Sequence, residues 1–235
     1  MQPRPPRPLA RLNPAPAPMH PSRFLLPCLL LALAGCATAP NPRESAALAV
    51  LKSDAGLREK ALACQQLADF AGPAAVPALA SLLAHEQLGD YARSGLESMA
   101  DPAAGAALLG ALETLQGRPL AGVINSLGVR RETAAVPALR RIVTKPGHAA
   151  APEAVGALGL IANPAAAQVL GEILRNGDQA LREAAAHAAL IAAERLTAAG
   201  QATEAGTLLE STLQAVPAGP AAEAARRQLA LRRAG

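Results

Sequence analysis

The sequence predicts an all-α fold, a right-handed α-solenoid of stacked antiparallel helix pairs with a period of about 30 residues. The first observation is a short recurring text containing Ala-Ala, whose copies open at Gly72, Asp101, Glu132 and Asn163, in steps of 29, 31 and 31 residues. The second is a leucine five residues before each copy, at positions 67, 96, 127 and 158. The third is a matching series of glycines at positions 89, 117, 147 and 177. A fixed period of this length is the signature of a stacked repeat.

Each repeat is expected to contain two helices. The first is apolar and ends near the marker leucine, and the second opens at the recurring text and ends at the glycine-containing break. Asp101 and Asn163 each precede a proline. A side-chain oxygen at such a position caps the second helix, and the proline presets the backbone of its first residue.

The second helix is expected to bury one apolar stripe, because its apolar residues recur at three- and four-residue spacing. Two copies of this stripe are Val76, Leu79, Leu83 and Val136, Leu139, Val143. Pro77 and Pro137 lie just past the first turn, where they are expected to loosen or bend the helix. One helix pair buries little surface, so only stacking gives a continuous core.

The repeats over about residues 54–196 resemble the short HEAT-like repeats of the phycobilisome-lyase type. More narrowly, Ala92-Arg93 with Leu96-Glu97, followed by the run from Gly122 to Arg131, is similar to a group of bacterial HEAT-repeat proteins. This resemblance implies the helix-pair fold. It implies no catalytic activity, because the lyase-type repeats do not carry catalysis as a motif.

The first 35 residues have the features of a signal peptide. Their charged residues are four arginines and no acid, and an apolar run from Phe24 to Ala34 is too short to span a bilayer comfortably. The ending Leu-Ala-Gly-Cys36 resembles a bacterial lipobox, which implies that Cys36 is diacylated and becomes the mature N-terminus. The alternative is an ordinary secretory signal that ends near a cysteine.

The start and the location of the protein follow from the same segment. Met19 to Gly35 forms a complete signal by itself, so translation is expected to begin at Met19, with a long leader from Met1 as the alternative. The resemblance to a lipoprotein implies a lipid anchor in the cell envelope. Ala37 is not the aspartate that resembles an inner-membrane retention signal in enteric bacteria, so the expected site is the outer membrane, facing the periplasm.

Removal of residues 1–35 changes the charge of the protein. The whole chain has 22 Lys and Arg against 18 Asp and Glu, and all of the excess lies in the signal. The mature chain is therefore neutral. The positive net charge, which was the main argument for nucleic-acid binding, belongs to the removed signal. Only Cys64 remains as a thiol after Cys36 is lipidated, so no intrachain disulfide is available, and a buried Cys64 is the simpler expectation than a reactive one.

The remaining chain divides into a tether at 36–43, a HEAT-like solenoid at 44–196 and a terminal section at 197–235. The terminal section resembles one tetratricopeptide-like repeat, with Gly200 at the turn and Pro217 after the second helix, although the usual aromatic residues are missing. A final helix at about 220–233 carries four arginines. Such a helix is expected to cap the solenoid, and the alternative is a basic tail that binds nucleic acid or lipid headgroups.

No catalytic, metal or cofactor site is predicted. His85 and His148 lie in breaks between repeats and His187 lies among alanines, and no pair of them has the spacing of metal ligands. The serines have no catalytic setting, and the glycines punctuate turns.

The charges on the solenoid are divided along the chain. Residues 54–113 have a formal charge of −5, and residues 118–145 have a formal charge of +5. A basic patch that binds an acidic protein partner, or the acidic section of a second copy, is one reading, and ordinary solvated surface is the other. The candidate partner-binding residues are Asn125, Arg130, Arg131, Arg140 and Arg141. Asn125 is expected either to cap backbone groups between repeats or to face the binding surface.

The function predicted from the sequence is a non-enzymatic, lipid-anchored scaffold of the cell envelope that binds a protein partner. One alternative is an accessory subunit or lyase-like factor of an envelope enzyme, which would require a small ligand in a concave pocket. The other alternative is a purely structural envelope protein.

Overall fold

The computed structural model describes residues 41–234, which form one compact unit. The predicted signal, including Met19, and the predicted lipidation site Cys36 lie outside the described residues. Every regular element between residues 41 and 234 is a helix, and no strand is present there. The all-α prediction is therefore confirmed.

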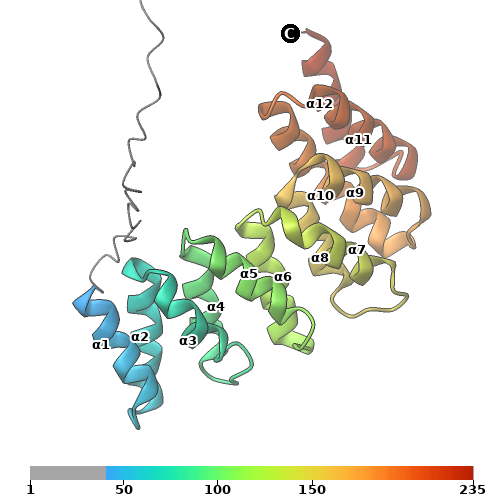
Figure 1. Ribbon diagram of the computed structural model, residues 1–235. Helices are drawn as coiled ribbons and strands as arrows, with labels where there is room; N and C mark the ends of the chain where they lie inside the picture. Colours follow the sequence, from blue (N-terminus) through green and yellow to red (C-terminus); the bar gives the residue numbers. More distant parts are fainter. Residues whose placement is uncertain (1–40, 235) are drawn as a thin grey trace, which may run out of the picture. The chain divides into compact units, whose positions relative to one another are not determined.

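Twelve α-helices follow one another in this part of the chain (Figure 1). They are α1 (Pro42–Lys52), α2 (Leu57–Phe70), α3 (Val76–Ala80), α4 (Gly89–Ser98), α5 (Pro102–Ala111), α6 (Gly117–Val129), α7 (Val136–Thr144), α8 (Ala151–Ile161), α9 (Pro164–Asn176), α10 (Gln179–Ala198), α11 (Ala202–Ala215) and α12 (Pro220–Ala234). Two 3-10 turns, Pro73–Ala75 and Thr133–Ala135, precede α3 and α7.

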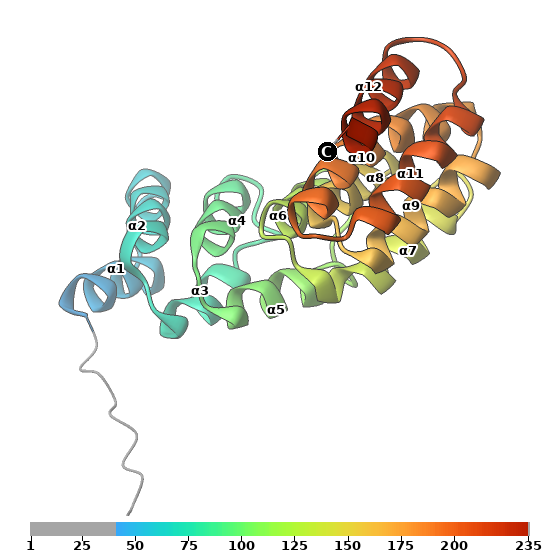
Figure 2. The same cartoon turned by 90° about the horizontal axis from the view of Figure 1, so that it is seen from above.

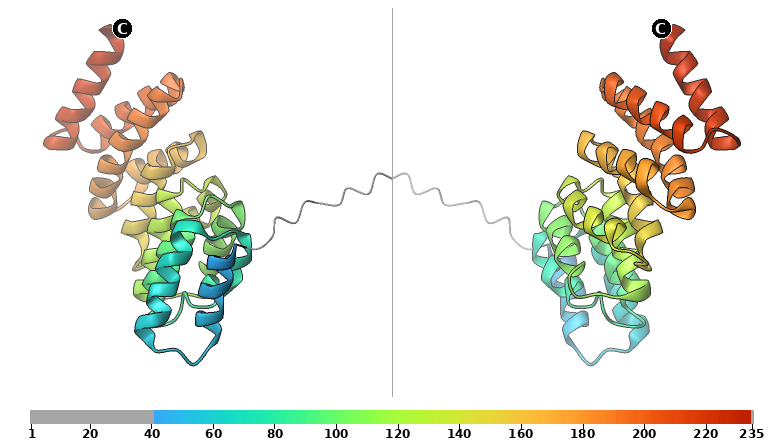
Figure 3. Two further views of the ribbon diagram at one scale, coloured as in Figure 1. Left: turned by 90° about the vertical axis from the view of Figure 1, so that its left-hand side faces the viewer. Right: turned by 90° about the vertical axis from the view of Figure 1, so that its right-hand side faces the viewer.

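The helices form two layers (Figure 2). The even-numbered helices pack in order from α2 to α12, and most odd-numbered helices pack on their odd-numbered neighbours, as α9 does on α11. Each even-numbered helix also contacts the odd-numbered helix that precedes it, and α12 closes the array against α10 and α11. The views from the two ends show α1 and α12 at opposite ends of this array (Figure 3). The prediction of an α-solenoid of helix pairs is thus confirmed.

The predicted starts of the second helices are confirmed at two repeats. The Asp101 side chain accepts a hydrogen bond from the Ala103 N–H at 2.8 Å, and Asn163 accepts one from the Ala166 N–H at 2.7 Å. In both helices the next residue is a proline that takes the first helical position. A proline costs nothing there, because that N–H has no partner within the helix.

The expected bend at Pro77 and Pro137 is replaced by a change of helix type. In both repeats the Ala-Ala text forms a 3-10 turn, and the α-helix begins only afterwards, at Val76 or Val136. Each proline is therefore the second residue of its α-helix. The missing N–H again falls where no intrahelical acceptor exists, so neither helix needs to bend.

The core is built from leucines and small residues. The four marker leucines at 67, 96, 127 and 158 are fully buried. Two glycines allow close contact between neighbouring even-numbered helices. A Cβ atom on Gly128 of α6 would lie 2.8 Å from Ala157 Cα of α8, and one on Gly159 of α8 would lie 2.8 Å from the backbone oxygen of Ala188 in α10.

The two ends of the array differ slightly from the sequence-based boundaries. The helix α1 already begins at Pro42, with the Asn41 side chain accepting a hydrogen bond from the Arg43 N–H, so the last residues of the expected tether are helical. At the other end, α10 runs past the expected boundary at 196/197 to Ala198, and α11 follows after a turn at Gly200. None of the described helices is long and apolar enough to cross a bilayer.

Candidate interaction surface

The five predicted partner-binding residues lie on three elements. Asn125 is exposed on α6, Arg130 and Arg131 lie in the turn after α6, and Arg140 and Arg141 are exposed on α7. Their side chains have different surroundings.

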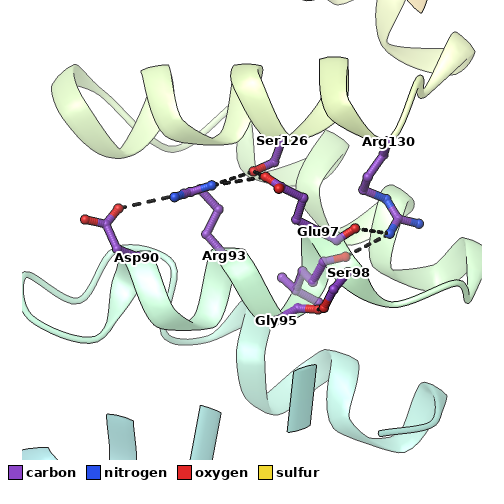
Figure 4. A network of polar contacts seen from close by, with 8 residues as sticks. Asp90, Arg93, Gly95, Glu97, Ser98, Ser126 and Arg130 are labelled. Carbon is purple, nitrogen blue, oxygen red and sulfur yellow. Dashed lines mark hydrogen bonds and ion pairs between the residues drawn. The ribbon is translucent and has the colours of Figure 1, made fainter. Parts of the chain in front are cut away.

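Arg130 is directed back into the repeat array and caps the preceding even-numbered helix (Figure 4). Its Nη1 donates hydrogen bonds to the backbone oxygens of Leu96 at 2.9 Å and Glu97 at 3.0 Å, and also to that of Met99. Its Nη2 donates to the oxygen of Asp101 at 3.2 Å. The Leu96 and Glu97 carbonyls belong to the last turn of α4, and those of Met99 and Asp101 follow it. At such a helix end four carbonyls lack intrahelical partners and carry the negative end of the helix dipole. Arg130 therefore has a structural role between repeats.

Arg195 makes the same kind of contact two repeats further on. It lies in the last turn of α10, and its Nη1 donates a hydrogen bond to the backbone oxygen of Leu160 at the end of α8. An arginine late in one even-numbered helix thus caps the end of the previous one at two places in the array. This recurrence supports a structural role for Arg130, in which it holds two neighbouring repeats together.

The exposed arginines of α7 pair with acids of the neighbouring repeats. Arg141 Nη2 lies 2.7 Å from Glu113 Oε1 in the loop before α6, and Arg140 Nη2 lies 3.0 Å from Glu172 Oε2 on α9. The first of these pairs joins residues 28 apart in sequence, close to one repeat period. Stacking therefore brings the basic section of the sequence beside acidic residues of the same chain, which reduces the charge available to a partner.

A polar network joins α4 to α6 (Figure 4). Arg93 Nη1 donates to Ser126 Oγ at 2.8 Å and to Glu97 Oε2 at 3.3 Å, and Ser126 Oγ donates to Glu97 Oε2 at 2.6 Å. Ser126 is fully buried, so its hydroxyl group requires these partners. At the edge of this network Asp90 Oδ2 accepts a hydrogen bond from Arg118 Nη2 at 2.6 Å. The network fixes α4 against α6 and is consistent with a structural role.

A group of exposed apolar side chains lies elsewhere, on α2 and α4, and was not predicted from the sequence. Leu57, Leu62 and Tyr91 are 47%, 48% and 41% exposed. They line a hollow of about 410 Å³ between the two helices. A second hollow of about 450 Å³ shares Gln65 and Tyr91 with the first and includes Asp69 and Asp90. We call this surface the α2–α4 face, with an apolar end at Leu57 and Leu62 and an acidic end at Asp69 and Asp90.

One signal for the α2–α4 face was present in the sequence. Leu62 and Tyr91 both lie five residues before a marker leucine, so they occupy equivalent positions in successive repeats. The same position is Gly122 in the next repeat and Glu153 in the one after it. Large apolar residues at this outward position are therefore confined to the first two repeats.

His85, His148 and Cys64 have structural roles, whereas His187 is exposed on α10. His85 Nδ1 accepts a hydrogen bond from the Leu88 N–H at 3.3 Å, and His148 Nδ1 accepts one from the Ala150 N–H at 3.2 Å. Cys64 is fully buried, and loss of solvation raises the pKa of its thiol. Among residues 41–234, no three His, Cys, Asp or Glu side chains come close enough to hold a metal ion.

Residues 106–191 match the family model of HEAT repeats. The helix pairs on both sides of this section continue the same two layers, so the chain is an α-solenoid, and the matched section of it is similar to HEAT repeats. Among solved structures, the complex of CpcE and CpcF of phycocyanin lyase from Nostoc sp. PCC7120 is similar over 80% of this chain and 82% of that chain, with 20% identity and a TM-score of 0.41. A search of curated proteins gave no match.

Proposed function

We propose that the protein is a non-enzymatic scaffold, anchored in the cell envelope by a lipid on Cys36, which binds a protein partner through the α2–α4 face. The observation that carries this proposal is the exposure of Tyr91 beside Leu57 and Leu62 over a continuous hollow. Tyr91 is one of three aromatic residues in the chain, and its side chain is 41% exposed. Aromatic and apolar side chains within a polar rim are typical of protein interfaces.

The predicted basic patch takes a smaller part in this proposal. Arg130 is used by the end of α4, and Arg140 and Arg141 each pair with an acid of the same chain. Asn125 and Arg131 are exposed on or next to α6, the even-numbered helix that follows α4. We assign these two residues to the rim of the contact, where charged residues affect the association rate more than the affinity.

The non-enzymatic part of the proposal is supported by the structural roles of the two loop histidines, His85 and His148, and of Cys64. The two histidines in loops accept backbone hydrogen bonds at the starts of α4 and α8, and the thiol of Cys64 lies in the core. These side chains come from separate repeats and have local structural partners. A catalytic site would instead bring a nucleophile, a base and their orienting groups together.

The lipid anchor is proposed from the lipobox resemblance and from the length of the tether. Six residues lead from Cys36 to the start of α1 at Pro42. Such a length spans at most about 20 Å when fully extended. The α1–α2 end of the array would thus stay near the membrane, and the α2–α4 face would meet partners that are themselves in the envelope.

Site-specific photocrosslinking in cells tests the proposed function. A photoreactive amino acid placed at position 62 or 91 is expected to give one discrete crosslinked protein, because these side chains lie in the contact. The matched control is Gln168, which is exposed on α9 in the other layer. Equal crosslinking at position 168, or none at positions 62 and 91, would contradict the proposed binding face.

A further inference from the structure

The terminal helix α12 has an uncovered face that differs from a purely polar cap. Its exposed side chains are spaced as one helical stripe: Glu223, Arg226, Arg227, Ala230 and Leu231. Leu231 is 75% exposed, more than any other large apolar side chain among residues 41–234. Terminal repeats of solenoids usually present a polar outer face. The combination of an exposed leucine with two arginines therefore suggests a surface that contacts another protein.

The chemistry of this stripe is complementary to the α2–α4 face. Arg227 and Leu231 are four residues apart, so they lie on the same side of α12 about one helical turn from each other. The α2–α4 face presents an apolar end, Leu57 and Leu62, which Arg58 also lines, and an acidic end, Asp69 and Asp90, with Tyr91 shared by the two hollows. Asp90 is paired with Arg118, so Asp69 is the acid at this end that the chain leaves for a partner. A helix with one apolar and one basic residue on the same side can fill the apolar end while its positive charge lies toward the acids.

The net charges of the two ends have the same complementarity. The section 54–113, which contains α2 and α4, has a formal charge of −5. The terminal section 220–235 has four arginines and one glutamate, a formal charge of +3. Asp90 and Glu113 of this acidic section pair with Arg118 and Arg141, so the charge available to a second copy is smaller than −5. The remaining acids, which include Asp69, still favour the orientation in which the two ends meet.

We propose that α12 of one copy docks on the α2–α4 face of a second copy, so that the protein associates head to tail. This inference rests on the proposed function, because it names an occupant of the face assigned there to protein binding. A contact made by a single helix is smaller than a standard interface of about 1,600 Å². The association is therefore expected to be weak, with a dissociation constant in about the micromolar range.

The two surfaces are different, so this contact is heterologous. Each copy that uses its α12 still has a free α2–α4 face, and such contacts extend into chains or close into rings. The average mass should accordingly rise beyond that of two chains as the concentration increases. For a two-fold symmetric dimer, by contrast, the average mass would not exceed that of two chains.

The test is sedimentation equilibrium of residues 39–235, which form a compact unit with its own core. Tyr91→Glu and Leu231→Glu should each remain monomeric at concentrations at which the wild type associates, with unchanged helicity by circular dichroism. Leu62→Glu is a second variant for the same face. Val129→Glu is the control, because Val129 is 57% exposed on α6 and lies outside both surfaces. It should associate like the wild type.

Mixing the two monomeric variants is the decisive step. Tyr91→Glu retains an intact α12, and Leu231→Glu retains an intact α2–α4 face, so together they can form one native contact. The mixture should give a 1:1 pair that grows no further. A monomeric wild type, a mixture that stays monomeric, or association that survives both substitutions would overturn the proposal. If a crosslinker at position 91 then still captures a different protein, the α2–α4 face binds that protein and not a second copy, and the proposed function is retained.

Discussion

Replacement of Gly159 by alanine should destabilise the protein, although alanine is the better helix former. Gly159 lies on α8, and a Cβ atom there would be 2.8 Å from both Ala188 Cβ and the Ala188 backbone oxygen. Carbon atoms prefer a separation of about 3.5–4.0 Å, so the contact would be roughly 1 Å too close. The atoms in the way belong to the backbone and the Cβ of α10. No side-chain rotation can relieve the overlap, and α10 must move.

The matched control is Gly156, one turn earlier on the same helix. Gly156 is exposed, and nothing lies within 4 Å of the Cβ that alanine would add. Both substitutions remove one glycine from the unfolded chain, which stabilises a helix by about 0.5–1 kcal/mol. Overpacking in a well-packed contact costs about 1–3 kcal/mol. The difference between the two variants isolates the cost of the α8–α10 contact.

Urea-induced unfolding followed by circular dichroism measures this difference. We expect Gly156→Ala to be slightly more stable than the wild type and Gly159→Ala to be less stable than Gly156→Ala by about 1–3 kcal/mol. Gly128→Ala should behave like Gly159→Ala, because its Cβ would lie 2.8 Å from Ala157 Cα. Equal stability of Gly156→Ala and Gly159→Ala would refute the idea that glycine permits the close contact of the even-numbered helices.

Three further predictions concern single side chains. Arg130→Ala should lower the free energy of unfolding by about 1.5–3 kcal/mol, because carbonyls at the end of α4 lose a charged hydrogen-bond donor. Arg140→Ala is the control, since Arg140 is on the exposed surface, and it should change the free energy of unfolding by less than about 1 kcal/mol in the same urea titration. Burial raises the pKa of the Cys64 thiol. Above about pH 8.5 the unfolded chain therefore loses this proton before the folded chain does, so the stability should fall as the pH rises through that range, and a Cys64→Ala variant should lack this part of the decrease. Cys36→Ser should abolish incorporation of a labelled fatty acid; equal labelling of the variant and the wild type would rule out the anchor.

Much of the fold could be predicted from the sequence because the repeat is marked several times. The marker leucines, the caps Asp101 and Asn163, and the glycine breaks each depend on local chemistry, and the structure confirms the helix pairs that they predict. The 3-10 turn before Val76 was missed, since a proline near a helix start is compatible with both a bend and a delayed start.

The surface was less predictable, because it depends on which residues of neighbouring repeats come together. A run of basic residues was visible in the sequence, but the direction of Arg130 depends on the position of the end of α4. The pairing of Arg141 with Glu113 had a signal that could have been used, since they are 28 residues apart, near one period. The spacing places Leu62 and Tyr91 at equivalent positions of successive repeats, but spacing alone does not show whether that position faces outward or is buried.

The most direct test of the proposed binding face uses the fact that Tyr91 is the only tyrosine of the chain. Its side chain is 41% exposed in the isolated chain, so a tyrosine-selective reagent such as iodine should modify it readily in dilute solution. The measurement is the modification rate at Tyr91 in intact envelopes compared with that of the purified, dilute protein. If the α2–α4 face binds a partner or a second copy, Tyr91 should be protected in the envelope. Equal rates in the two samples would contradict a binding role for this face.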